Sequence, residues 1–279
     1  MIKDYQNWHR IYKFLGIKIQ KKITPQKKER VNLIFDPKTG IGNRIFALMN
    51  AINYFNPIEI NFYWEDRTWV SAKFFDLFNP CFDIKINEYN DSKCYNSFKN
   101  SKNEITIYYP SCAYKKLNGQ SLALLYNSIP IEVLKEYKKP FELLKPAEKV
   151  LERIGSANLD SDFCALQIRN APDWGEYGRN EKIELFYREI DKLDNNKQIF
   201  LCAMNKEISN TIKQRYPNRI VELENKNYKS MIDALSDLYI LKNAKSAIYS
   251  NGSTFCELAF WLSQYNQQVT IVGSNENWK

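Results

Sequence analysis

The chain has 279 residues, of which 44% are hydrophobic, and a formal net charge of +8. It contains no apolar run of about 18 residues that would span a bilayer, and no apolar secretory leader, so we expect a cytoplasmic protein. Six scattered cysteines without a C-x-x-C pair and a single histidine, His9, argue against a zinc site and against Ser-His or Cys-His catalysis, so we interpret the cysteines as reduced and structural.

Residues 1–30 carry most of the charge. They hold nine Lys or Arg residues against two acidic residues, which is +7 of the net +8. Apolar and aromatic residues recur between the basic ones at helical spacing: Ile2, Tyr5, Trp8, Tyr12 and Leu15. We interpret this segment as a basic amphipathic leader that lies on an anionic membrane surface or packs as a helix against the body. Nucleic acid is the weaker alternative, because the rest of the chain adds no second basic cluster.

The next segment predicts one α/β lobe. Residues 31–35 (VNLIF) read as a buried strand, 36–42 as a turn, and the following apolar residues have helical spacing. Residues 58–64 and 104–110 read as further strands. In residues 135–154, Pro146 suits the first position of a helix, and Pro140 and Pro146 interrupt the pattern before it. We therefore expect an N-terminal lobe over 31–145 and a C-terminal lobe over 146–279.

The C-terminal lobe shows a clean alternation of strands and helices. The expected strands are 163–168, 198–204, 219–223, 246–250 and 269–273, and the expected helices are 183–193, 206–216, 230–244 and 254–264. Such alternation predicts a parallel, doubly wound sheet. Ligands of these sheets bind at the carboxyl ends of the strands, so candidate site residues are sought there.

Three turns follow strands in the expected lobes. In Gly40-Ile41-Gly42-Asn43-Arg44, glycines and a helix N-terminus suit the close approach of an anion, but a tight turn is the simpler interpretation. Arg169, at the end of a strand, suits a phosphate or diphosphate, with a salt bridge inside its loop as the alternative. In the stretch Ser250-Asn251-Gly252-Ser253-Thr254, small donors could hold an anion, whereas a capping box of Thr254 with Glu257 explains only the helix start. Together these turns suggest a sugar-nucleotide transferase.

The same motifs resemble a known superfamily. A Gly-x-Gly-Asn turn, a strand ending in Ile168-Arg169, and the segment DLYILKNAKSAIYSNGSTFCELAFWL (237–262) are similar to the α-1,6-fucosyltransferase superfamily, which includes nodulation fucosyltransferases and protein O-fucosyltransferases. The resemblance covers about residues 31–264 and is strong in three short motifs. It implies a GT-B-like α/β fold of two Rossmann-like lobes with a nucleotide-sugar cleft between them. It also implies inverting sugar transfer without a metal or other cofactor.

The resemblance also assigns roles to individual residues. Arg169 would stabilise the leaving diphosphate, and Glu176 or Asp173 would be the catalytic base. Donor contacts would come from both lobes: Gly40, Gly42, Asn43, Arg44, Gln167, Asp237, Ser250, Asn251, Gly252, Ser253 and Thr254. Asp237 matches an aspartate placed against the guanine amino group.

The chain departs from the family pattern in two places. The His-x-Arg-Arg motif is here Gln167-Ile168-Arg169-Asn170, and an acidic pair corresponds to Met204-Asn205. These departures support a phosphate contact more than a particular base or sugar. The resemblance favours GDP-fucose as the donor, with GDP-mannose, GDP-heptose or another nucleotide sugar as alternatives. A non-catalytic nucleotide-binding peripheral membrane protein is the alternative to an enzyme. The leader resembles those of bacterial enzymes that build lipopolysaccharide or capsule, which implies a glycan or glycolipid acceptor at the inner face of the inner membrane, and no nucleic-acid partner is expected.

Overall fold

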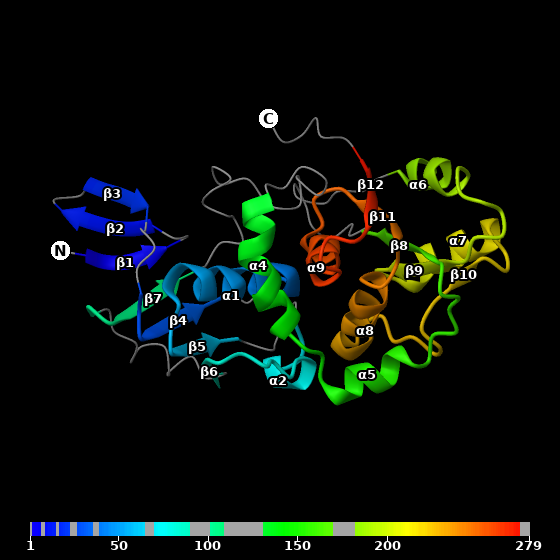
Figure 1. Ribbon diagram of the computed structural model, residues 1–279. Coiled ribbons are helices and arrows are strands. Elements are labelled where there is room, and N and C mark those ends of the chain that lie inside the picture. The colour runs from blue at the N-terminus through cyan, green and yellow to red at the C-terminus, as the bar shows by residue number, and fades with distance from the viewer. Residues whose placement is uncertain are drawn as a thin grey trace. The chain divides into compact units, whose positions relative to one another are not determined.

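The computed structural model describes residues 2–6, 9–14, 17–22, 27–35, 39–64, 70–89, 101–108, 131–169 and 182–273. These residues form two compact units (Figure 1). The first comprises described residues of Met1–Ser121 together with Ile131–Lys145, and the second comprises those of Pro146–Lys279. Each unit contains one β-sheet and its own helices, so the two are described separately.

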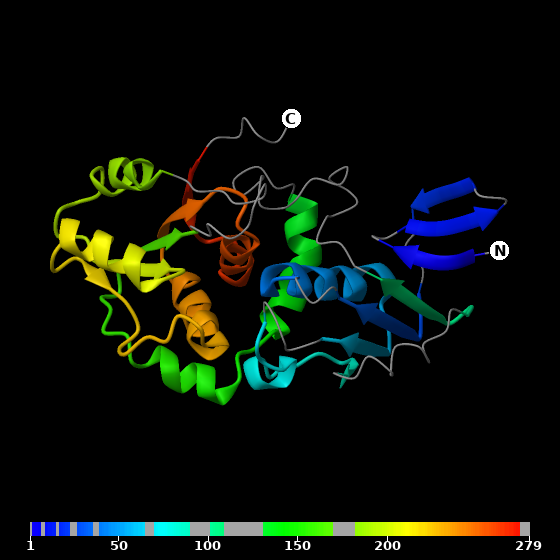
Figure 2. The same ribbon diagram turned by 180° about the vertical axis from the view of Figure 1, so that it is seen from behind.

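The first unit is built on a sheet with the strand order β3-β2-β1-β7-β4-β5-β6. Its strands are β1 (Ile2–Gln6), β2 (His9–Phe14), β3 (Ile17–Lys22), β4 (Arg30–Ile34), β5 (Glu59–Tyr63), β6 (Lys85–Tyr89) and β7 (Glu104–Tyr108). Strands β7, β4, β5 and β6 are parallel. The helices are α1 (Ile41–Phe55), α2 (Phe74–Leu77) and α4 (Ile131–Leu143), and α4 runs beside α1 (Figures 1 and 2). The expected strands near residues 31, 58 and 104 and the helix after the first turn are thus confirmed.

The prediction of a leader helix was wrong. Residues 2–22 instead contain three short antiparallel strands, and β1 joins the edge of the sheet through a parallel pair, Gln6 with Tyr108. The sequence IKIQKK of β3 begins with strict alternation of apolar and polar residues, which suits a strand. β-Branched and aromatic residues in β2 favour the same state, and strand pairing outweighs the helical spacing of the wider segment.

Helix α4 also departs from expectation. The helix includes Pro140, which was expected to interrupt the chain. Val133, Tyr137 and Phe141 are spaced four residues apart and are all buried. Burial of this apolar stripe compensates for the hydrogen bond that the proline removes. The following helix, α5 (Glu148–Ile154), begins after Ala147, two residues later than the position expected for Pro146.

The second unit has a five-stranded parallel sheet in the order β10-β9-β8-β11-β12. Its strands are β8 (Cys164–Ile168), β9 (Ile199–Ala203), β10 (Ile220–Val221), β11 (Ser246–Ser250) and β12 (Gln268–Val272). Its further helices are α6 (Ile183–Ile190), α7 (Lys206–Arg215), α8 (Met231–Leu241) and α9 (Thr254–Leu262). The predicted strands, helices and parallel doubly wound arrangement of this unit are confirmed.

Helices cover both faces of the second sheet. Alternate strand residues, such as Leu166 and Leu201, pack against α6 and α7. The intervening residues face α8 and α9, as the contact between Cys256 of α9 and Gln167 of β8 shows. Because both faces are covered, every residue of β8 and β9 is buried, which explains their continuous apolar runs.

One face of the first sheet carries polar rows in register. Asn87, Asn61 and Asn32 form a chain of amide hydrogen bonds, each 2.8 Å long, which ends on the Thr106 hydroxyl at 3.0 Å. Asn32 and Asn61 are buried, so these amides satisfy one another across four strands.

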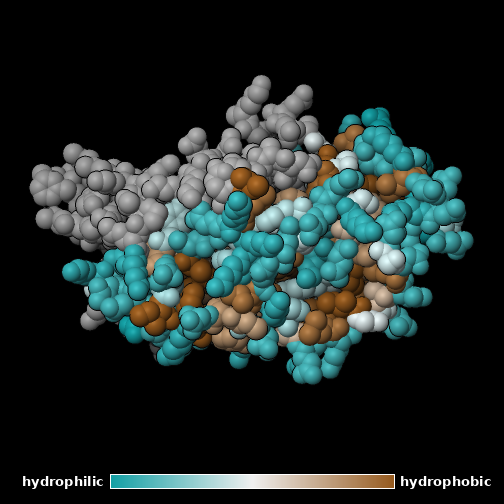
Figure 3. All heavy atoms as spheres, in the orientation of Figure 1, coloured by the Kyte–Doolittle hydropathy of each residue, from teal (hydrophilic) through white to brown (hydrophobic). Residues whose placement is uncertain are grey.

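On the surface, apolar residues gather in separate patches between hydrophilic ones on the face that Figure 3 shows.

Candidate functional site

The second sheet has a topological switch point between β8 and β11. From β8 the chain moves outward to β9 and β10, and then returns to the other side of β8 to form β11 and β12. Crevices at the carboxyl ends of strands that flank such a point are the usual ligand sites of open α/β sheets. Arg169 follows β8, and the Ser250–Thr254 turn follows β11, so the fold brings these two predicted elements to this point.

Arg169 is hydrogen-bonded to the turn after β11. Its backbone N–H donates to Ser250 Oγ over 2.7 Å, and the Ser250 hydroxyl donates to the Gln167 carbonyl over 3.2 Å. The Arg169 guanidinium donates from Nη1 to the Gly252 carbonyl at 3.4 Å. The guanidinium therefore lies beside the N-terminus of α9. The positive charge of Arg169 and the positive end of the α9 dipole thus lie together at the carboxyl edge of the second sheet.

The turn itself is explained in part by local structure. Ser253, not Thr254, is the N-cap of α9, and its hydroxyl accepts from the Cys256 N–H at 3.5 Å. The expected capping box of Thr254 with Glu257 was therefore placed one residue too late. Gly252 has φ 63°, a left-handed conformation that favours glycine. Ser250 and Asn251 are both buried. The Ser250 hydroxyl accepts a hydrogen bond from the Arg169 N–H and does not cap the helix.

Gln167 and Cys256 lie beneath this turn. The Cys256 thiol donates to Gln167 Oε1 at 2.8 Å, and both side chains are buried. Burial raises the pKa of Cys256 to about 12, so the thiol stays protonated and remains a donor. Gln167, expected to contact the donor, thus links β8 to α9 in the core. Sequence reasoning treated Cys256 only as a small apolar residue and missed this contact.

Asp237 lies in α8, paired with a lysine that the sequence did not single out. Lys226 Nζ is 2.6 Å from Asp237 Oδ2, and the two side chains are 5% and 2% exposed. Burial raises the pKa of Asp237 to about 6, although the charge of Lys226 opposes that shift. Burial lowers the pKa of Lys226, but the charges of Asp237 and Glu222 outweigh it, so that pKa is raised.

In the first unit, Gly40 is the N-cap of α1. It has φ −68° and no atom within 4 Å of the position where a side chain would begin. Neither backbone strain nor packing therefore requires glycine there. In the described residues, α1 has no side-chain cap and no acidic residue in its first turn, and buried Asn43 Oδ1 has no hydrogen-bond partner. Gly42 is itself buried within this first turn. These features favour close approach of a polar ligand.

Arg44 occupies the core of the first unit. Its side chain is 0% exposed, Nε donates to the Thr39 carbonyl at 2.8 Å, and Nη1 donates to the Trp64 carbonyl. The guanidinium also lies 4.9 Å from the Trp64 ring centre and 5.8 Å from that of Phe35. Its direct contact with a donor stays a prediction, whereas its role in positioning the first turn of α1 is plain from these contacts.

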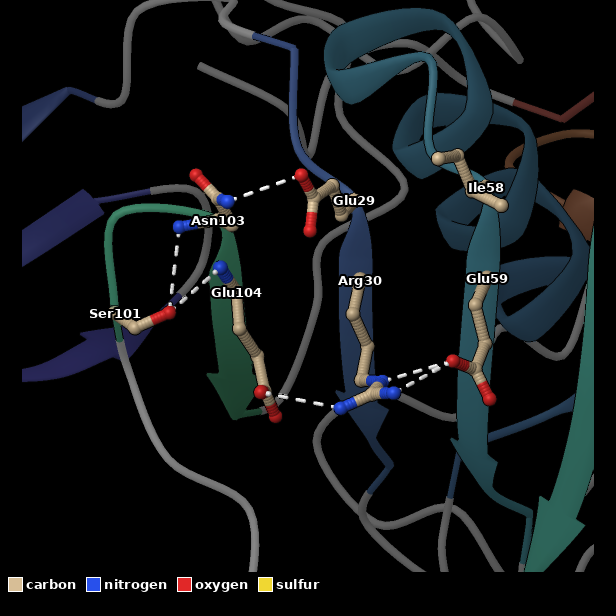
Figure 4. Close-up of a pocket in the computed structure, with 7 residues that line it drawn as sticks. All are labelled: Glu29, Arg30, Ile58, Glu59, Ser101, Asn103 and Glu104. Atoms are coloured by element: carbon tan, nitrogen blue, oxygen red, sulfur yellow. Dashed lines mark hydrogen bonds and ion pairs between the residues drawn. The ribbon is translucent and has the colours of Figure 1, made fainter.

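A pocket of about 360 Å³ lies at the amino ends of β4, β5 and β7 (Figure 4). Arg30 bridges Glu59, at 2.9 Å, and Glu104, at 3.5 Å. Partial burial raises the pKa of Glu59, but hydrogen bonds from Arg30 and Asn87 outweigh it and leave that pKa lowered. Within the first unit, the pocket lies at the opposite ends of the strands from the Gly40–Arg44 turn, and its charges pair with one another across the strands.

The two candidate bases, Asp173 and Glu176, lie outside the described residues. Within the described residues, no group of three or more His, Cys, Asp or Glu side chains is arranged to hold a metal ion. The helices in that part of the chain also include none long and apolar enough to cross a membrane.

Comparisons with known proteins find similarity in structure but not in sequence. No protein-family model matches the chain. No curated protein matches it either. The solved structures that share its fold at low identity include those of three fucosyltransferases, NodZ, FUT1 and POFUT1. The fucosyltransferase NodZ from Bradyrhizobium has a TM-score of 0.53 at 14% identity, over 84% of this chain and 93% of that chain.

The other two structures were solved with GDP. A variant of FUT1 from Arabidopsis thaliana has a TM-score of 0.54 at 14% identity, over 90% of this chain and 72% of that one. POFUT1 has a TM-score of 0.52 at 12% identity, over 89% of this chain and 100% of that one. The chain thus has the GT-B type of α/β fold found in these fucosyltransferases, and the resemblance stated from the sequence is confirmed at the level of the fold.

Proposed function

We propose that this protein is a glycosyltransferase that uses a GDP-linked sugar, with GDP-fucose as the favoured donor. The observation that carries the proposal is the placement of Arg169 and the Ser250–Thr254 turn at one switch point, joined by the 2.7 Å hydrogen bond from Arg169 to Ser250. The shared fold supports it, because NodZ has been solved with GDP-fucose, and FUT1 and POFUT1 with GDP.

The proposed chemistry is an inverting displacement in which the nucleoside diphosphate leaves. Negative charge then grows on the β-phosphate, and the guanidinium of Arg169 with the N-terminus of α9 would stabilise it. Electrostatic stabilisation of this kind needs no metal. Asp173 or Glu176 would remove the proton from the acceptor hydroxyl. Gly40 and Asn43 of the first unit would contact the donor where no side chain blocks its approach.

The proposal is tested by titrating the purified protein with GDP, GDP-fucose, GDP-mannose, a GDP-heptose and UDP, with and without EDTA, and by following release of GDP. A ligand that binds only the folded state raises its melting temperature. We expect stabilisation by GDP and GDP-fucose that EDTA leaves unchanged. If GDP-mannose or a GDP-heptose stabilises the protein more than GDP-fucose, the fold assignment stands and the donor changes. Absence of stabilisation by any nucleotide would overturn the proposal.

A nucleotide-binding protein without turnover is the second candidate, because Arg169 beside a helix N-terminus is also suited to simple diphosphate binding. Arg169→Ala separates the two. In a transferase, this variant should lose about 100-fold or more in kcat and much less in GDP affinity, since the arginine meets charge that develops in the transition state. If the wild-type protein shows no turnover and Arg169→Ala loses about 100-fold in GDP affinity, the non-catalytic candidate is favoured.

We further propose that the acceptor is a bacterial surface glycan, such as lipopolysaccharide or capsule, built on a lipid carrier. Residues 1–30 would hold the protein on the anionic inner face of the membrane. The charge of this segment supports an anionic partner, because residues 1–30 hold nine Lys or Arg residues against two acidic residues.

A further inference from the structure

Met204 is an exposed apolar residue at the carboxyl edge of the second sheet. It directly follows β9, and its side chain is 41% exposed. Ile168 of β8 pairs with Ala203 of β9, so Arg169 and Met204 are the next residues along two neighbouring strands. Neighbouring strands lie about 5 Å apart. A large apolar side chain is therefore open to solvent beside the arginine of the proposed phosphate contact.

The residue after Met204 is committed to local structure. Asn205 is the N-cap of α7, and its side chain accepts from the Ile208 N–H at 2.9 Å. The first carboxylate after β9 belongs to Glu207, which lies in the first turn of α7. Of the two residues directly after β9, Met204 is thus the one that is open to a ligand. Its thioether offers apolar contact and only a weak hydrogen-bond acceptor.

The proposed phosphate contact determines which part of a donor reaches Met204. Arg169 Nη1 donates to the Gly252 carbonyl, so the guanidinium leans toward the turn after β11 and the N-terminus of α9. Strand β9 lies on the other side of β8 from β11. With the β-phosphate held by Arg169 and α9, the nucleoside extends away from β11. One strand spacing, about 5 Å, is close to the length of one phosphate unit, which brings the ribose to the carboxyl end of β9.

We propose that Met204 packs against the ribose of the donor nucleotide, and that affinity for the nucleotide does not depend on the ribose 2′-hydroxyl. This inference rests on the proposed function and makes Met204 a specificity-determining residue. In dinucleotide-binding Rossmann folds, an Asp or Glu beyond the phosphate-binding turn accepts from the 2′-hydroxyl. Here the strand next to the phosphate contact ends in a methionine, whose thioether covers ring carbons and treats ribose and 2′-deoxyribose alike.

The test compares GDP with 2′-deoxy-GDP by calorimetric titration of the full chain. The wild-type protein should bind the two with affinities that agree within about threefold, whereas a site that holds the 2′-hydroxyl with a carboxylate would favour GDP by about tenfold or more. Met204→Ala should weaken both ligands equally, by about fivefold, because it removes apolar contact. Met204→Glu supplies an acceptor and should favour GDP over 2′-deoxy-GDP by about tenfold.

Leu151 provides the matched control. It lies in α5 and is 54% exposed, so Leu151→Ala and Leu151→Glu make equivalent changes on the surface of the same unit, outside the carboxyl ends of the strands. Both control variants should bind GDP and 2′-deoxy-GDP like the wild type. Because Met204 and Leu151 are both exposed, we expect all four variants to fold, and their melting temperatures check this.

The outcomes separate this inference from the proposed function. If the wild-type protein binds neither nucleotide, the proposed function itself fails. If it binds GDP about tenfold more tightly than 2′-deoxy-GDP, the proposed function stands and the role of Met204 is overturned. That role is also overturned if Met204→Ala binds like Leu151→Ala, or if Met204→Glu keeps the wild-type ratio of the two affinities. Equal binding by the wild type, with a preference for GDP created by Met204→Glu, supports the contact with ribose.

Discussion

The backbone N–H of Arg169 donates to the hydroxyl of Ser250 over 2.7 Å, and that hydroxyl donates in turn to the carbonyl of Gln167. A single side chain of β11 thereby fixes the end of β8 at the point where the strand order reverses. The direction of the Arg169 side chain depends on this backbone, so Ser250 acts as a positioning residue for the proposed phosphate contact.

Replacing Ser250 with alanine should therefore impair the site more than the fold. The change leaves the Arg169 N–H without its acceptor, which should cost about 1–2 kcal/mol in the free energy of unfolding. Because the guanidinium is then less well placed, we expect GDP-sugar turnover to fall by about tenfold or more. Ser263→Ala is the control, since the Ser263 hydroxyl bonds the Phe260 carbonyl at the far end of α9. Equal turnover in both variants would contradict the positioning role.

The two glycine turns should respond differently to substitution. Gly252 has a positive φ, so Gly252→Ala should destabilise the protein by about 1 kcal/mol or more. Gly40 has an extended conformation and open space around it, and serine is a better N-cap than glycine. Gly40→Ser should thus keep or raise the melting temperature and still weaken GDP-sugar binding, because the new side chain enters the space left for the ligand. Unchanged affinity in Gly40→Ser would show that this space is not used.

Much of the second unit could be predicted because each of its strands is a short apolar run between amphipathic helices. β6 was missed, since its sequence KINEY has no apolar run and lies at the sheet edge. The N-terminal strands were missed because they depend on pairing with one another and with β7.

The candidate site was predicted less completely than the fold. Residues that end strands at a switch point can be found from the order of elements. The pairing of Lys226 with Asp237 depends on how the connection after β10 packs against α8, and no local pattern encodes it. Arg44 shows that a local pattern can also suggest a site contact that the structure does not show. An arginine beside a glycine turn suggests an anion site, whereas the guanidinium of Arg44 is buried against Trp64.

Asp237 should make stability depend on pH in a way that can be isolated. Burial raises its pKa from 3.8 to about 6, so between these values the folded state holds a proton that the unfolded chain has released. The free energy of unfolding must therefore fall as the pH rises from about 4 to about 6, owing to this group. The asparagine of Asp237→Asn cannot titrate, so the free energy of unfolding of this variant should lack the pH dependence that Asp237 contributes. Urea denaturation at pH 4.5 and pH 7 should show the variant gaining stability relative to the wild type as the pH rises, and parallel curves would contradict the raised pKa.

The N-terminal strands allow the proposed membrane contact to be tested without deleting them. Deletion of residues 1–28 would also remove β1 from the edge of β7, whereas Lys13→Glu keeps all three strands in the chain. With this substitution the segment loses two units of positive charge. Because each basic residue contributes about 1 kcal/mol at an anionic surface, sedimentation with phosphatidylserine vesicles should weaken by about tenfold.

The matched control for that experiment is Lys149→Glu, which makes the same change of charge on the exposed surface of α5 in the second unit. This variant should sediment with vesicles like the wild type, and both variants should bind GDP with unchanged affinity. If Lys13→Glu and Lys149→Glu weaken sedimentation equally, the attraction comes from net charge alone. In that case residues 1–30 form an extension of the first sheet that has no particular affinity for the membrane.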